Sequence, residues 1–250
     1  MKRLFFRLST ALLTFLIGIT LSLSWYASRQ SLGLKEKSTS VPDTQWAEYG
    51  TLMWNVQMAK ARGEKEYAIS SIGCGMGVST LKEALSGYTI VIAQPVEKKT
   101  FMNTYGLRTW YRFKVTETLS SKPVHDFHRE SLASVEIPAD LLPVHADEIL
   151  IPESGGIVEV EGVKVAEYSN SPQYSLSNKY LLFLELDSDR QVGFVPWTDE
   201  IGIFTVDDNG KLKASDNDSY DLKEKMASRF DNSVEHLKSY LGHHAKAKRR

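Results

Sequence analysis

Three histidines near the middle of the chain carry the side chains best suited to metal chemistry. His125 and His128 lie three residues apart, and His145 follows in the same stretch. Imidazole nitrogens are common ligands for zinc and similar ions, and a carboxylate such as Asp126 can join them. Residues 121–145 contain prolines and little periodicity. We therefore expect a solvated loop, and we keep a metal-dependent hydrolase using these histidines as an alternative function.

A glycine-rich stretch is the second candidate. Gly73, Gly75 and Gly77 alternate after a short β-like stretch and precede a short predicted helix. This resembles the first glycine motif of Rossmann-type methyltransferases, in which the backbone approaches S-adenosylmethionine closely. Ser71 stands where that family usually has an acidic residue, and no βαβ alternation follows. We favour a loop joining two helices, with a methyltransferase as the less favoured alternative.

The other chemistry-bearing residues form no recognisable catalytic set. The sequence has neither a Gly-x-Ser-x-Gly elbow nor a Gly-x-x-x-x-Gly-Lys phosphate loop. Asp216, Asp218 and Asp221 lack the glycine and distal glutamate of a calcium loop, so we interpret them as a helix cap. Sequence alone does not pair any two strand glutamates as acid and base: Glu117, Glu159, Glu161 and Glu185. We assign no catalytic, cofactor-binding or metal residue and expect no cofactor.

Composition narrows the classes of protein further. Thirty basic residues nearly balance thirty-one acidic ones, so no whole-chain positive field exists to attract nucleic acid. The single cysteine, Cys74, cannot form an intramolecular disulfide, which argues against a disulfide-stapled scaffold. An apolar content of 42% and a charged content of 24% are ordinary for a globular protein.

The N-terminus predicts targeting to a membrane. Leu8–Tyr26 contains no charged residue and follows three positive charges. A run of this length, about 19 residues, suffices to span a hydrocarbon core. Trp25 and Tyr26 make a poor cleavage site and suit a membrane interface. We predict a retained anchor over residues 1–28, single-pass in the inner membrane with the body outside the cytoplasm. The alternative is a cleaved signal peptide and a secreted or periplasmic protein.

The rest of the chain divides into a linker at 29–41, a helical lead-in at 42–87 and strands at 88–215. In the lead-in, Pro42–Ala61 has an apolar stripe at helical spacing through Trp46, Tyr49, Met53 and Val56. Short apolar and alternating runs separated by turn signals then predict an antiparallel barrel or sandwich. The fold class is mainly β with flanking helices (α+β), built as a small antiparallel β-barrel.

A final helix is predicted over residues 219–242, followed by a basic tail at 243–250. Tyr180–Leu184 has apolar residues at both odd and even positions, so both faces of this strand should be buried against other parts of the protein. The apolar stripe through Met226, Phe230 and Leu237 is the natural cover for one of them. The same helix and tail could instead contact another membrane protein, which we keep as a third hypothesis.

The region Leu81–Leu212 resembles a domain of uncharacterised exported or membrane-anchored bacterial proteins. The resemblance rests on strand and turn signatures over about half the chain: Tyr88–Val96, Thr109–Leu119, Gly155–Val158, Tyr180–Leu184 and Gly202–Val206. It implies a small OB-like barrel and carries over no catalytic residue. We therefore predict a membrane-anchored, extracytoplasmic, noncatalytic module. Its expected partners are the membrane and an envelope protein or polymer, and not nucleic acid.

Overall fold

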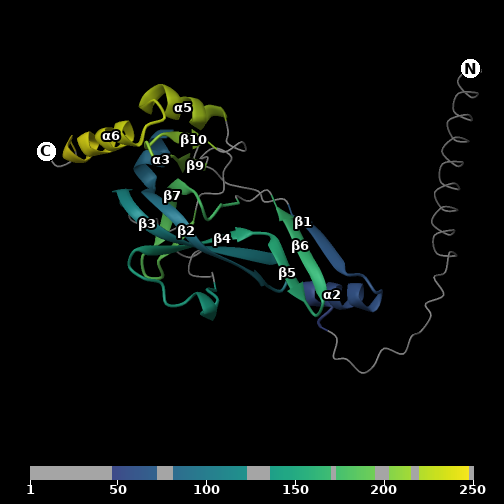
Figure 1. Ribbon diagram of the computed structural model, residues 1–250. Coiled ribbons are helices and arrows are strands. Elements are labelled where there is room, and N and C mark those ends of the chain that lie inside the picture. Colours follow the sequence, from purple (N-terminus) through teal and green to yellow (C-terminus); the bar gives the residue numbers. More distant parts are fainter. Residues whose placement is uncertain are drawn as a thin grey trace, which may run out of the picture. The chain divides into compact units, whose positions relative to one another are not determined.

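The structure is a computed structural model, and it describes residues 47–71, 81–122, 136–169, 173–194, 203–214 and 220–247 (Figure 1). A compact unit begins at Ala47. The predicted anchor, the linker and the glycine-rich stretch from Ile72 onward lie outside the described residues. Within the described ranges, no helix is both long enough and apolar enough to cross a membrane.

Five strands form a closed ring of hydrogen-bonded neighbours in the order β2-β3-β4-β8-β7, because β7 also pairs with β2. Their bounds are β2 Thr89–Met102, β3 Leu107–Ser120, β4 Glu148–Ser154, β7 Lys179–Asp187 and β8 Val192–Phe194. Two further strands, β9 (Phe204–Val206) and β10 (Leu212–Ala214), extend the sheet beyond β7. The expected mainly β fold with flanking helices is confirmed.

The prediction of a wholly antiparallel arrangement does not hold at one pair in the ring. Leu150 of β4 lies opposite Val192 of β8 in parallel register, whereas the other neighbours in the ring are antiparallel. The reason is topological: directions cannot alternate all the way around a ring with an odd number of strands.

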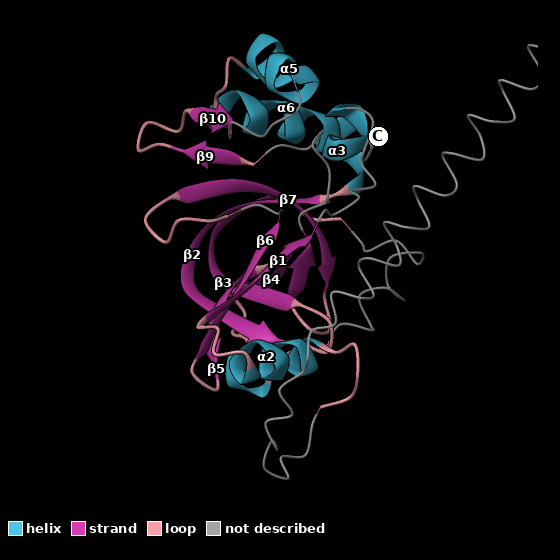
Figure 2. Ribbon diagram, turned by 90° about the vertical axis from the view of Figure 1, so that its right-hand side faces the viewer, coloured by secondary structure: helices cyan, strands magenta, loops and turns pink. Residues whose placement is uncertain are grey.

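Strand β7 separates two apolar cores, as the sequence predicts. Tyr180, Leu182 and Leu184 face the interior of the ring. Leu181 and Phe183 face outward into a second core. That outer core contains Met226, Phe230 and Leu237 together with residues of α3 (Leu81–Gly87). Figure 2 shows α3, α5 and α6 gathered on the side of β9 and β10, with α2 at the opposite end of the strands. The predicted cover over β7 is confirmed.

The predicted single C-terminal helix is in fact two helices, α5 (Tyr220–Phe230) and α6 (Val234–Ala247). Asp231 and Asn232 interrupt it with left-handed backbone, at φ of 50° and 48°. The carbonyl of Asn232 then accepts a hydrogen bond of 2.7 Å from the backbone N–H of Leu212. The break therefore lets the chain pair with the β9–β10 hairpin.

A three-stranded sheet and a helix complete the compact unit. The strands β1 (Glu66–Ser71), β6 (Val163–Ser169) and β5 (Gly156–Val160) lie in that order. β1 pairs in parallel with β6, so the predicted helical lead-in also contains a strand. Glu161 and Gly162 form the turn that joins β5 to β6, and both residues have positive φ.

Helix α2 (Leu52–Ala61) is shorter than the predicted Pro42–Ala61, since Thr51 is its N-cap. The hydroxyl of Thr51 accepts a 3.2 Å hydrogen bond from the backbone N–H of Trp54, which satisfies a donor of the first turn. The helix buries Leu52, Val56 and Ala59. Tyr49, which the sequence placed on the buried stripe, is exposed.

Candidate functional site

The described structure gives no support from geometry to the metal hypothesis. His125 and His128 lie outside the described residues. The backbone N–H of His145 donates a 3.1 Å hydrogen bond to Glu148 Oε2. Among the described residues, no three or more His, Cys, Asp or Glu side chains are grouped as metal ligands. The metal-dependent hydrolase therefore stays a prediction, as does the methyltransferase, whose glycines are also outside the described residues.

One end of the ring is closed by aromatic side chains. Tyr174, from the segment before β7, packs edge-to-face on Tyr111, Phe113 and Tyr180, with ring centroids 5.0, 5.0 and 5.3 Å away. Tyr174 is 4% exposed. The hydroxyl of Tyr180 accepts a 2.8 Å hydrogen bond from the backbone N–H of Ser175. These contacts hold the segment that contains Tyr174 and Ser175 across one end of the ring. We call this segment the plug.

A buried carboxyl lies at this closed end. Glu153 continues the inward parity of Ile149 and Ile151 on β4 and is 1% exposed. Its Oε1 accepts a 3.1 Å hydrogen bond from the hydroxyl of Tyr174, and its Oε2 has no partner among the described residues. Burial raises the pKa of Glu153 to about 8, against the smaller lowering effect of Tyr174. The carboxyl is therefore neutral at pH 7.

Sequence reasoning did not select Glu153, although a signal was present. In the run Glu148–Ser154, Glu153 falls at alternate positions with two isoleucines, Ile149 and Ile151, on a strand that is apolar at most positions. A carboxylate at an apolar position is unusual unless it is paired or protonated. Glu153 lies at the closed end of the ring and does not line the cleft at the other end.

At the other end of the ring, the described residues leave a cleft of about 450 Å³. Its apolar floor is made by Val91, Val115, Ile149, Leu184 and Leu186. Around them lie hydroxyl and amide side chains: Thr89, Thr116, Thr118, Ser121, Ser188 and Gln191. A small apolar base with several polar groups is the usual composition of a ligand site, and the volume lies in the usual range.

Among the described residues, the charged side chains that line the cleft are all carboxylates, on Glu117, Asp147 and Glu148. Each carboxylate contacts a cation that does not line the cleft. Lys238 lies 2.9 Å from Glu117, Lys114 lies 3.5 Å from Asp147 and Arg112 lies 2.8 Å from Glu148. The cations are thus turned away from the cleft while the carboxylates border it. This arrangement disfavours a polyanion and suits a neutral or basic ligand.

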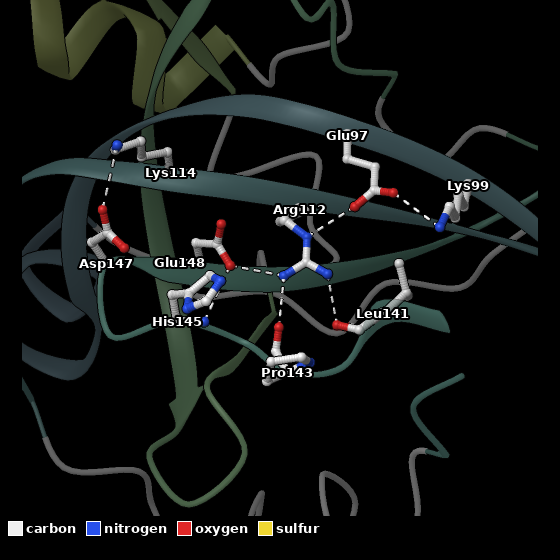
Figure 3. A network of polar contacts seen from close by, with 9 residues as sticks. All are labelled: Glu97, Lys99, Arg112, Lys114, Leu141, Pro143, His145, Asp147 and Glu148. Atoms are coloured by element: carbon white, nitrogen blue, oxygen red, sulfur yellow. Dashed lines mark hydrogen bonds and ion pairs between the residues drawn. The ribbon is translucent and has the colours of Figure 1, made fainter. Parts of the chain in front are cut away.

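Arg112 of β3 organises one wall of this region (Figure 3). Its guanidinium donates to Glu97 at 2.9 Å and Glu148 at 2.8 Å, and to the carbonyls of Leu141 at 2.7 Å and Pro143 at 3.2 Å. The side chain of Arg112 is only 12% exposed. Charge-assisted hydrogen bonds of this kind are stronger than neutral ones. The hydrogen bonds to Leu141 and Pro143 hold the segment before β4, residues 136–147, against β3.

The pKa values of both carboxyl partners respond to this network. Hydrogen bonds from Arg112 and then Lys99 lower the pKa of Glu97. For Glu148, burial alone would raise the pKa, but the backbone N–H of His145 and Arg112 together lower it. Both groups are therefore ionised at neutral pH and bind Arg112 as carboxylates.

The same segment covers the outer face of β3 and β4. Leu141 is fully buried against Trp110, Leu150 and Val192, and Val144 packs beside them. The outward face of these two strands is therefore filled by the protein's own chain. The cleft at the open end of the ring remains as the candidate site.

Comparison with known proteins adds no identification. No family model, curated protein or solved structure matches this chain. The resemblance to exported bacterial domains remains a prediction.

Proposed function

We propose that this protein is a membrane-anchored, noncatalytic binding module. Its ring of strands is an OB-like barrel, and the cleft at the open end of the ring receives a neutral or basic segment of an envelope protein or polymer. The observation that carries the proposal is the cleft itself, with an apolar floor, bordering hydroxyls and cations directed away from it.

The strand order supports the OB-like assignment. Strands β2, β3 and β4 follow one another as neighbours, and β7 returns by a long connection to lie beside β2. This is a Greek key, and β8 closes it between β4 and β7. A five-stranded Greek-key barrel is the OB architecture.

OB-folds bind oligonucleotides and oligosaccharides on the face of their second and third strands. Here those strands are β3 and β4, and the segment held by Arg112 covers that face. The proposed ligand therefore lies across the open end of the ring instead. A five-stranded ring is too narrow to take a ligand inside, because side chains fill even larger barrels. The ligand rests on the floor of the cleft.

The anchor supplies the second half of the proposal. Leu8–Tyr26 is apolar and long enough to span a bilayer, and the positive charges before it favour a body outside the cytoplasm. An intact chain should remain in the membrane pellet after a high-salt wash. A full-length soluble cytoplasmic protein would contradict this part of the proposal.

Photocrosslinking in intact cells tests the cleft. Thr118 lines the cleft and is exposed, so it can be replaced by benzoylphenylalanine in the full chain. Ser70 on β1 is exposed and does not line the cleft, so it is the matched control position. We expect light-dependent adducts to a protein or polymer from position 118 and not from position 70. Equal adducts from both positions, or none from either, would refute binding in the cleft.

A further inference from the structure

Three aromatic residues belong to the start of α2 and to the turn of the β2–β3 hairpin, at the hairpin end that is remote from the cleft. The backbone N–H of Leu52 donates a 2.8 Å hydrogen bond to the carbonyl of Thr104, which joins the start of α2 to the hairpin turn. Tyr105 belongs to that turn, and Tyr49 contacts Trp54 edge-to-face at 4.7 Å between ring centroids. We call Tyr49, Trp54 and Tyr105 the aromatic tip.

The turn that carries Tyr105 has a defined geometry. The side-chain oxygen of Asn103 accepts hydrogen bonds from the backbone N–H groups of Tyr105 at 3.0 Å and Gly106 at 2.8 Å. Leu52 and Leu107 beside it are almost fully buried. The tip thus has a packed base and a fixed backbone.

The two tyrosines nevertheless lie outside that core. Tyr49 is 82% exposed and Tyr105 is 80% exposed, the highest values among the large apolar side chains of the described residues. Leaving such rings in water forgoes the burial that stabilises aromatic residues elsewhere in the fold. Exposed apolar rings on a packed base form a candidate contact surface.

The path of the chain identifies the contacting surface. The compact unit begins at Ala47, two residues before Tyr49. The predicted anchor ends at Tyr26, so twenty residues, 27–46, separate the two. A chain of twenty residues reaches at most about 70 Å. An anchored chain therefore holds the aromatic tip at high local concentration near the lipid surface.

Tyrosine and tryptophan suit that surface chemically, because their rings are apolar and carry one polar group each. Both residues are enriched where the hydrocarbon meets the headgroups. Two cations at the C-terminal end of α2 are paired with carboxylates, Lys60 with Glu161 and Arg62 with Glu64. The attraction is therefore interfacial, and a zwitterionic bilayer suffices for it.

We propose that the aromatic tip rests in the interface of the bilayer that holds the anchor, which turns the cleft away from the membrane. The aromatic tip adjoins the hairpin turn between Met102 and Leu107. The cleft instead includes Thr89, Val91 and Thr118, near the other ends of β2 and β3. Each strand has 14 residues, a length of up to about 45 Å. This inference rests on the proposed anchor and adds an orientation for the binding site.

Lipid quenching of a site-specific probe tests this orientation. The full chain, with Cys74→Ser to remove the native thiol, is reconstituted in phosphatidylcholine vesicles. A bimane label is attached to Tyr105→Cys or, as the control, to Tyr168→Cys on β6, which is also exposed at 59%. Doxyl-labelled phosphatidylcholine should quench the label at position 105 at least twofold more than the label at position 168. Circular dichroism confirms that both variants fold.

The outcomes separate the two proposals. If the chain stays with the vesicles but position 105 is quenched no more than position 168, the orientation is refuted and the anchor stands. Shielding of position 105 from aqueous iodide without lipid quenching would indicate a protein partner or a second copy, and would also refute it. Loss of the chain from the vesicles after a salt wash would overturn both proposals.

Discussion

The hydroxyl of Tyr174 donates a hydrogen bond of 3.1 Å to Oε1 of Glu153 inside the ring of strands. This contact joins the plug to β4 at a position where an ionised carboxylate would be buried among aromatic rings. It also couples the closed end of the ring to pH, because burial raises the pKa of Glu153 to about 8.

Stability should therefore fall between pH 5 and pH 8. A glutamate in the unfolded chain has a pKa near 4.5, so the unfolded state ionises first as the pH rises. The stabilisation is complete below that value and is lost as the pH rises through the folded pKa of about 8. The total loss should be at most about 5 kcal/mol, at 1.36 kcal/mol per pH unit. Urea unfolding of wild type and Glu153→Gln across this range measures it. A difference between the two proteins that does not change with pH would contradict the assignment.

Removing the tyrosine hydroxyl isolates the hydrogen bond. Tyr174→Phe keeps the edge-to-face packing but leaves Glu153 without its donor. At pH 5, where the carboxyl is protonated in the folded protein, we expect a loss of about 1–2 kcal/mol. The same urea titration measures it. Unchanged stability would mean that the hydroxyl contributes nothing to holding the plug.

Arg112→Met should release the segment before β4. The change leaves Glu97 and Glu148 without their shared partner and removes the donors to Leu141 and Pro143. Arg112 is 12% exposed but Glu97 is 33% exposed and keeps Lys99, so removing the guanidinium should cost about 1.5–3 kcal/mol. Hydrogen exchange of residues 136–147 should accelerate as well. Lys114→Met is the control, because its pair with Asp147 is exposed and long at 3.5 Å, so it should cost about 0–1 kcal/mol.

Phe183→Ala tests the core between β7 and the C-terminal helices. The ring is 1% exposed among Met226, Phe230 and Leu237, so truncation should cost about 3–5 kcal/mol. Leu176→Ala, at a residue 47% exposed, should cost about 0.5 kcal/mol or less. Denaturant titration compares the two. A cost below about 1 kcal/mol for Phe183→Ala would mean that this strand is not central.

Deleting the chain from Tyr220 onward should expose the same core. The deletion removes Met226, Phe230, Val234 and Leu237, all nearly or fully buried. We expect lower stability and increased binding of an apolar dye such as ANS. Retention of full stability would instead favour the third hypothesis, that the helices are available to a partner.

Local pattern predicted the elements whose burial follows from their own residues. The two-sided apolar run Tyr180–Leu184 required cover on both faces, and the stripe through Phe230 provides it. Gly162 takes its positive φ in the β5–β6 turn without steric cost, as its residue type favours. Glu161 before it also takes positive φ, which is uncommon for a residue other than glycine and does not follow from its type.

Features that depend on distant contacts were not predictable in this way. The helix break at Asn232 is fixed by its bond to Leu212, and the ring closes through β8, a strand of only three residues. Tyr49 fitted a helical stripe, yet the helix begins after Thr51. The cleft is assembled from four strands, the turn after β7 and the segments that follow β3 and precede β4, so no single sequence motif predicts it.

The most direct test of the binding site fills the cleft and measures the loss of its ligand. Ser188 lines the cleft, whereas the adjacent exposed Asp189 does not. With benzoylphenylalanine at position 118 of the full chain in cells, Ser188→Trp should reduce the light-dependent adduct at least tenfold, and Asp189→Trp should leave it unchanged. An adduct that survives Ser188→Trp at its original yield would contradict a ligand in the cleft.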